Sequence, residues 1–273
     1  MSNPAIARAV ERKRQATTIE LGTVAETLAD GVMVFDEVGS PVNRACGLGV
    51  DGPVSGEDLD RIVAFYDQRQ VPATVEVGSY AHESVVFGLG ARGFVLDQLT
   101  HVFARDLVAE EDVAGLVLSG TPPGVTIEPV DPDDENAVRT LARVVLLGFY
   151  PDPSAITPAQ MRPSTRAVKL AGSDAFLARI DGEVVGGGRS ESGDGMTALM
   201  GASVLPSHRG RGIQRALMSA RIEQAWRRGS RVVTVGSAPG GPTERNAVRL
   251  GFRMVCMRFR FVRPHASALP PGS

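Results

Sequence analysis

The segment SHRGRGIQRAL, residues 207–217, places two glycines and several cationic side chains directly before an apolar, helix-like stretch. The first N–H groups of a helix lack partners within the helix, and the helix dipole makes that end partly positive. Because glycine lets a ligand approach the backbone closely, this arrangement suits a phosphate or pyrophosphate group. The alternative interpretation is an arginine-rich surface loop before an ordinary helix, since short glycine motifs also arise by chance.

The composition limits the other kinds of partner. The chain has 273 residues, of which 43% are hydrophobic and 22% are charged, as is typical of globular proteins. The chain contains 29 Lys and Arg and 31 Asp and Glu, so its net charge is −2, and we expect no nucleic-acid partner. No apolar run is long enough to span a bilayer, so we expect no membrane partner. Cys46 and Cys256 are too few for a disulfide framework or a cysteine-based zinc site, which predicts no metal and a cytoplasmic location.

Sequence patterns predict the elements that would position the glycine loop. Asp181 and Gly182 are a hairpin signal between the strands AFLARI and EVVGGGRSE, and a third strand, MTALMGASVL, follows the turn SGDG. After the loop we expect a helix over 213–228, a strand RVVTVGS, a short helix GPTERNAVRL and a last strand FRMVCMRFRFV. The glycines at 186–188 predict a bulge or a close backbone approach. Near the start of the chain, the run ERKR is expected to be a solvated helix face.

The chain contains an internal repeat with an offset of 158 residues. VEVGS, residues 75–79, corresponds to VTVGS, residues 233–237, and in both copies a Gly-Phe pair follows with the same spacing. The same shift places a candidate helix over 56–70 on the helix that follows the glycine loop. We therefore predict two copies of one fold.

The two copies differ where the glycine loop should lie. The first copy has LGVDGPVSG followed by EDLD, so that Asp51, Glu57, Asp58 and Asp60 would repel a phosphate. In the second copy the helix carries another apolar stripe, Met218, Ile222, Ala225 and Trp226. A helix that is apolar on two sides is covered on two sides. Either the first copy or a homodimer partner is expected to supply the cover.

SVLPSHRGRGIQRALM and NAVRLGF resemble two segments of the GNAT superfamily of acyl-CoA-dependent acetyltransferases. The resemblance implies an α/β (α+β) fold of two GNAT-like units, each a mixed, mostly antiparallel sheet flanked by helices. We expect a degenerate unit without phosphate loop over 1–120, a catalytic unit over 121–263 and a flexible tail over 264–273.

The resemblance also implies a site for acetyl-CoA as cosubstrate. The backbone of 202–204 would pair with the pantetheine arm like an added strand, and the N–H groups of 209–214 would hold the pyrophosphate. Two positions depart from the family pattern: Gln214 replaces a glycine or alanine, and Ala247 stands near the usual tyrosine acid. The expected cofactor-binding residues are Ala202, Ser203, Val204, Arg209, Gly210, Arg211, Gly212, Ile213, Gln214, Arg215 and Asn246.

The implied reaction moves an acetyl group from acetyl-CoA to an amine of a small molecule or peptide by direct attack. An amine with a pKa of about 10.4 is mostly protonated at pH 7, so the site must desolvate it or supply a base. Glu191 or His208 is the candidate base, and Ser237 is the candidate proton donor through water. The alternative roles are an exposed turn carboxylate for Glu191, a residue of the phosphate loop for His208 and a helix cap for Ser237. A non-catalytic acyl-CoA sensor is the alternative function.

Overall fold

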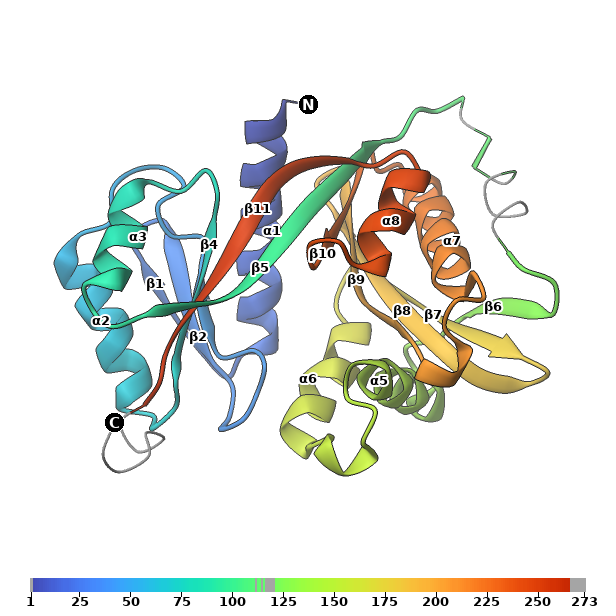
Figure 1. Ribbon diagram of the computed structural model, residues 1–273, viewed down its shortest axis with the longest axis horizontal. Helices are drawn as coiled ribbons and strands as arrows, with labels where there is room; N and C mark the ends of the chain where they lie inside the picture. Colours follow the sequence, from blue (N-terminus) through green and yellow to red (C-terminus); the bar gives the residue numbers. More distant parts are fainter. Residues whose placement is uncertain (1, 111, 114, 116–120, 266–273) are drawn as a thin grey trace. The chain divides into compact units, whose positions relative to one another are not determined.

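The computed structural model describes residues 2–110, 112–113, 115 and 121–265, which form two compact units (Figure 1). The first unit comprises the chain up to Val102 and again from Val255, and the second unit comprises Phe103–Met254. This division differs from the contiguous one expected at residue 120, because strands near residues 102 and 255 run from one unit into the other. Most of the expected tail, 266–273, and residues 119–120 of the predicted linker lie outside the described residues.

The first unit is a six-stranded sheet in the order β1-β2-β3-β4-β11-β5. β3 and β4 are parallel, whereas β4 and β11 are antiparallel, with Arg258 opposite Gly78 and Arg263 opposite Ala73. β11 therefore belongs with the first unit rather than with the second, where the sequence placed it. The elements are α1 (Asn3–Leu21), β1 (Val24–Leu28), β2 (Gly31–Phe35), β3 (Arg44–Cys46), α2 (Gly56–Asp67), β4 (Ala73–Gly78), α3 (Glu83–Gly90), β5 (Val95–Asp106) and β11 (Arg253–Arg263).

In the second unit the strand order is β10-β9-β8-β7-β6, and the end of β5 lies beside β10. β7 to β9 are the three predicted strands and pair antiparallel in sequence order, β6 adds a further antiparallel strand beside β7, and β9 and β10 are parallel. The predicted Asp181-Gly182 hairpin is present, since both residues have positive φ angles. The elements are β6 (Val125–Pro129), α5 (Glu135–Phe149), η1 (Pro153–Ala155), α6 (Pro158–Val168), β7 (Ser173–Ile180), β8 (Glu183–Gly193), β9 (Met196–Val204), η2 (Pro206–His208), α7 (Ile213–Arg227), β10 (Val232–Ser237) and α8 (Pro242–Arg249).

The sequence repeat is also a structural repeat. A shift of 158 residues carries the starts of α2, β4, α3 and β5 to positions 214, 231, 241 and 253. The observed starts of α7, β10, α8 and β11 are Ile213, Val232, Pro242 and Arg253, each within one residue of the shifted position. Parallel pairing of β3 with β4 matches that of β9 with β10. Both copies therefore repeat the same order of elements.

Two sides of α7 are buried inside the second unit, although Trp226 of the predicted second stripe is 37% exposed. Ile213 and Leu217 pack with Val185 and Val204 of the sheet. On the other side, the second stripe packs with residues of β10, of α8 and of the segment that follows α8. It also packs with Phe103, Leu107 and Val113 from the first half of the sequence. That cluster contains Phe103, Leu107, Val113, Leu199, Met218, Ile222, Ala225, Val233, Val235, Ala247, Leu250 and Phe252. Because this core covers the stripe, the stripe gives no reason to expect a homodimer.

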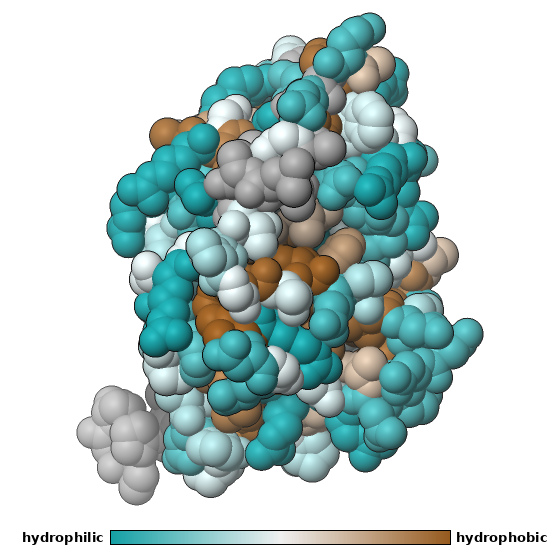
Figure 2. Space-filling view, turned by 90° about the vertical axis from the view of Figure 1, so that its right-hand side faces the viewer, coloured by the Kyte–Doolittle hydropathy of each residue, from teal (hydrophilic) through white to brown (hydrophobic). Residues whose placement is uncertain are grey.

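The surface is a mixture of polar and apolar side chains. On the face drawn in Figure 2, apolar side chains form separate brown areas between teal polar ones. Such scattered apolar surface is normal for a globular protein. Among the described residues, no helix combines the length and the apolar character that crossing a membrane requires.

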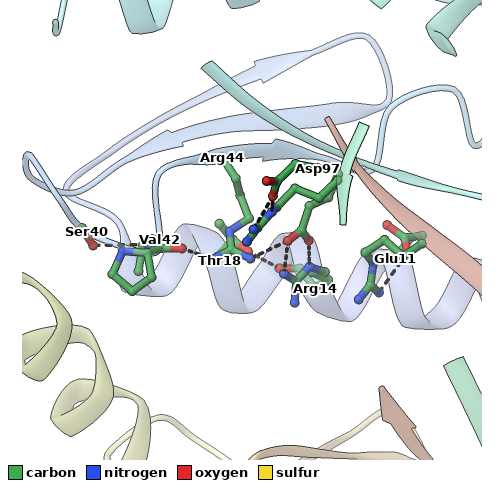
Figure 3. Close-up of polar contacts among 11 residues, drawn as sticks. Glu11, Arg14, Thr18, Ser40, Val42, Arg44 and Asp97 are labelled. Atoms are coloured by element: carbon green, nitrogen blue, oxygen red, sulfur yellow. Dashed lines mark hydrogen bonds and ion pairs between the residues drawn. The ribbon is translucent and has the colours of Figure 1, made fainter. Parts of the chain in front are cut away.

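A buried network of charges joins α1 to the sheet of the first unit (Figure 3). Glu76 on β4 accepts hydrogen bonds from Arg14 on α1 and, at 2.8 Å, from Arg44 on β3. Beside it, Glu11 on α1 accepts from Arg258 on β11 at 3.0 Å. Only 8% of the Glu76 side chain and 6% of the Glu11 side chain are exposed. The ERKR run is thus helical as expected, but its first residue, Glu11, is buried, its last, Arg14, is half-buried, and both form ion pairs.

Candidate functional site

The glycine loop lies before α7 in the geometry that an anion requires. Gly210 and Gly212 have φ angles of 77° and 79°, a left-handed conformation that favours glycine. Gly212 is the N-cap, no side chain caps the helix, and the first turn contains no acidic residue. The first helical hydrogen bond runs from the N–H of Ala216 to the carbonyl of Gly212, so the preceding N–H groups of α7 have no partner within the helix. This end of the helix combines N–H groups that precede the helical hydrogen-bond ladder with the positive end of the dipole.

Arg209 supports the loop rather than extending from it. Its Nε donates to the carbonyl of Val204 at 3.2 Å, and its Nη2 donates to the carbonyl of Gly148 at the end of α5. These contacts tie the loop to the end of β9 and to α5. They differ from the expected side-chain contact to a phosphate, whereas Arg211, in the middle of the loop, is exposed.

Gln214, which departs from the family pattern, is held by α8. Its Nε2 donates to Oγ1 of Thr243 at 2.7 Å. The amide therefore links the first turn of α7 to the first turn of α8. The departure from glycine or alanine thus has a structural explanation within the second unit.

β9 has a free edge next to this loop. Its pairing with β10 ends at Leu199 opposite Val235, although β9 continues to Val204 and β10 to Ser237. On its other edge β9 remains paired with β8 as far as Val204 opposite Gly186. Residues 202–204, the expected partners of an added strand, lie in this free segment. The Ser203 hydroxyl points to α5 and donates to the carbonyl of Val145 at 2.8 Å.

The predicted bulge at the triple glycine is present. The β8–β9 register shifts between Gly187 and Arg189. A Cβ atom at Gly188 would lie 2.7 Å from the Cβ of Ala202 and 3.1 Å from Cζ of Arg221, so only glycine fits. Nothing in the sequence around Arg221 marks it as a special position, whereas three consecutive glycines in a strand indicate that another group approaches the strand closely.

Glu191, one of the expected catalytic residues, is buried and held in an ion pair. Glu191 is not an exposed turn residue: it lies in β8, its side chain is 8% exposed, and it is paired with Arg189 at 3.1 Å. A carboxylate held in this way must break its ion pair before it can accept a proton. Burial lowers the pKa of Arg189, against the opposing charge of Glu191.

Two further candidates make local hydrogen bonds. The Ser237 hydroxyl donates to the carbonyl of the next residue, Ala238, at 2.9 Å and does not cap α8, whose N-cap is Gly241. His208 shares a hydrogen bond with the Ser207 hydroxyl at 2.9 Å through Nδ1. These contacts do not aim either side chain at one particular acceptor.

The α8 positions agree with the departure noted in the sequence. Asn246 is half-buried on α8, and the fully buried Ala247 packs with Val235 and Phe252 in the core. A side chain at 247 points into this core. Ala247 therefore supplies no proton donor where many relatives have a tyrosine.

The corresponding loop of the first unit is occupied by a carboxylate of the chain itself. Gly47 and Gly49 have φ angles of 78° and 74°, like the pair before α7. Asp30 accepts from the N–H of Gly49 at 2.8 Å and from the N–H of Asp51 at 2.6 Å. The first turn of α2 is capped by Ser55 and contains Glu57 and Asp58. In this copy Asp30 already binds the N–H groups of Gly49 and Asp51, and the helix start is acidic.

Comparison with protein families decides what the second unit is. Residues 144–252, which run from α5 to the residues after α8, match the model of the acetyltransferase (GNAT) family. The second unit carries a GNAT acetyltransferase domain. The glycine loop, the free edge of β9 and Asn246 all lie within the matched part of this GNAT domain.

Solved structures match the fold over most of the chain. A GCN5-related N-acetyltransferase from Kribbella flavida has a TM-score of 0.70 at 18% identity, covering 96% of this chain and 97% of that chain. A tandem GNAT protein from the clavulanic acid biosynthesis pathway has a TM-score of 0.58 at 16% identity, covering 86% and 78%. No curated protein matches the chain in sequence. At these identities the likeness concerns the fold, which is two GNAT-like units.

Proposed function

We propose that the GNAT domain transfers an acetyl group from acetyl-CoA to an amine of a small molecule or peptide by direct attack. The observation that carries the proposal is the loop at 209–212, which leads into the N-terminus of α7, without a side-chain cap, next to the end of β9 beyond its last pair with β10. GNAT proteins generally use acyl-CoA, whose thioester supplies an activated acyl group. The choice of acetyl as the acyl group and of an amine as the acceptor is our addition to this general activity.

The residues present fit the acyl-CoA cosubstrate. The N–H groups from Gly210 to Gln214 would hold the pyrophosphate, and the backbone of 202–204 would pair with the pantetheine arm. The N–H of Arg209, expected in the same role, donates to the carbonyl of Pro206 at 3.4 Å. Asn246 would hydrogen-bond the arm from α8. Among the described residues, an added Cβ at Gly210 meets nothing within 4 Å, whereas one at Gly212 would lie 2.9 Å from Cγ of Pro122, so the room for a ligand is at Gly210.

The amine must lose a proton before it attacks the thioester, and the leaving thiolate must gain one. Glu191 is held in an ion pair with Arg189, and Ala247, near the position where the resemblance implies a tyrosine acid, has no exchangeable proton. We therefore assign the lowering of the amine pKa to desolvation, with water carrying the proton. The same observations favour the second candidate function, a non-catalytic acyl-CoA sensor that retains the phosphate loop. Steady turnover distinguishes the two.

The test is a thiol-release assay with acetyl-CoA and a panel of amines, amino acids and antibiotics, on the wild-type protein and two Gly210 variants. Gly210→Asp and Gly210→Asn have the same shape, and both residues tolerate a positive φ. Because only aspartate brings a negative charge to the phosphate loop, we expect it to weaken acetyl-CoA binding roughly tenfold or more relative to asparagine. Acetyl-CoA should also raise the melting temperature of the wild type. Equal binding by the two variants would place the pyrophosphate elsewhere, and binding without turnover would favour the sensor.

We also propose that the first unit is a degenerate copy that binds no acyl-CoA. Asp30 occupies the backbone donors of its loop, and the start of α2 is acidic. Isothermal titration calorimetry is expected to give one acetyl-CoA per chain, and Gly210→Asp should weaken that single site roughly tenfold or more. Two sites per chain, one of them insensitive to Gly210→Asp, would contradict the degenerate assignment. The free, buried Cys46 and Cys256 fit a reducing compartment, and we propose the cytoplasm.

A further inference from the structure

Arg221 on α7 is an arginine buried without an ion pair. Its exposed fraction is 2%, and among the described residues no carboxylate forms an ion pair with it. Burial lowers the pKa of its guanidinium to about 10, so the group is still charged at neutral pH. A buried charge without a counter-ion is costly, and its hydrogen bonds must compensate.

The partners of Arg221 are backbone carbonyl groups on two strands. Its Nη1 donates to the carbonyl of Arg189 on β8 at 3.1 Å and to that of Met200 on β9 at 3.4 Å. Its Nε donates to the carbonyl of Leu217, one turn earlier on α7. Arg189 and Met200 face each other across the strands, directly beside the register shift. The guanidinium thus bridges the two strands where the ladder is irregular.

This bridge stands at the start of the free edge of β9. Met200 is the first residue of β9 after the last pair with β10, Leu199 opposite Val235. The free segment 200–204 therefore begins at a carbonyl group that Arg221 holds. The absence of a side chain at Gly188 provides the space for the guanidinium, since an added Cβ would lie 3.1 Å from Cζ of Arg221.

We propose that Arg221 is a positioning residue for cosubstrate binding, which fixes the bulge and thereby sets the direction in which the free edge of β9 faces the pantetheine arm. The proposal rests on the proposed acetyl-CoA site. It assigns Arg221 no contact with the ligand and no effect on the phosphate loop. Loss of the bridge should weaken the pantetheine contacts and leave the pyrophosphate contacts as they are.

Two ligands separate these contacts. Acetyl-CoA carries both the pantetheine arm and the pyrophosphate, whereas 3′-phospho-ADP carries the pyrophosphate without the arm. For Arg221→Met we expect acetyl-CoA affinity to fall about tenfold, the effect of losing one or two hydrogen bonds, while 3′-phospho-ADP affinity is unchanged. Arg221→Lys keeps the charge and should restore part of the acetyl-CoA affinity. Arg227→Met is the control on the same helix, since Arg227 is exposed and pairs with Glu223, and it should change neither affinity.

Gly188→Ala disturbs the same bridge from the other side, and Arg221→Lys decides the matter if Arg221→Met does not fold, with a smaller but still selective loss of acetyl-CoA affinity expected. The methyl group added at Gly188 would lie 3.1 Å from Cζ of Arg221 and 2.7 Å from Cβ of Ala202. It therefore disturbs both the guanidinium and the strand segment that the guanidinium positions, without touching the phosphate loop, and we expect the same selective loss of acetyl-CoA affinity. Equal losses for both ligands, or no loss for either, would overturn the positioning role. Failure of the wild type to bind acetyl-CoA would instead refute the proposed function itself.

Discussion

Replacing Glu76 by glutamine is expected to lower the free energy of unfolding of the first unit by about 3–5 kcal/mol, the usual cost of removing one partner from a buried ion pair. Glutamine keeps the shape of the side chain and can still accept a hydrogen bond. It removes the charge that compensates Arg14 and Arg44, both of which donate to Glu76 from neighbouring elements. Urea unfolding followed by circular dichroism measures the difference.

The effect should also depend on pH. Burial by itself would raise the pKa of Glu76, but the charges of Arg14, Arg44 and Arg258 outweigh it and hold the pKa well below its usual range. A lowered folded pKa stabilises the fold above the unfolded value of about 4.3, and this contribution is lost as the pH falls through the folded value. The difference between wild type and Glu76→Gln should therefore be constant above about pH 5 and shrink in acid.

A matched variant in the same unit gives the control for Glu76. Asp97 on β5 pairs with Arg260 on β11, and both side chains are about 40% exposed. Asp97→Asn should cost less than about 1 kcal/mol, because exposed ion pairs are weakened by solvent. If both variants lost the same amount, burial would not be the reason for the importance of Glu76.

A fragment of residues 123–273, which contains the whole part matched by the GNAT family, is expected not to fold cooperatively. It lacks Phe103, Leu107 and Val113, which are buried in the core of the second unit. Burying each such side chain contributes about 1.5–3 kcal/mol, so their combined loss is comparable with the total stability of a domain, about 5–15 kcal/mol. The fragment also keeps β11 but lacks its partner β4.

A second fragment, residues 103–254, corresponds to the complete second unit and serves as the comparison. It should unfold cooperatively and bind acetyl-CoA, while fragment 123–273 should aggregate or melt without a transition. Addition of the first half of the chain in trans should restore a transition to fragment 123–273. A cooperative, active monomer of residues 123–273 would show that residues 103–113 are dispensable for the second unit.

Local sequence patterns were enough to predict the features that depend on neighbouring residues. The two glycines before α7 predicted a backbone that a ligand can approach closely, and both adopt positive φ angles. The Asp181-Gly182 pair predicted a hairpin, and the triple glycine predicted the bulge. The repeat followed from element spacing, which the chain preserves even where the side chains of the loop have changed. These features arise from backbone preferences within a few residues, which residue types record directly.

Only the tertiary structure decided which distant groups meet. Sequence placed β11 with the catalytic copy, but its hydrogen bonds go to β4. It treated ERKR as solvated, yet Glu11 pairs with Arg258, 247 residues away. Glu191 lies beside Arg189 on the same face of β8, but only the folded chain shows that both are buried and paired. Arg221 looked like an ordinary polar position of a helix. The physical reason is the same in each case: element type follows from local periodicity, whereas burial and the choice of a partner depend on contacts that chain spacing does not encode.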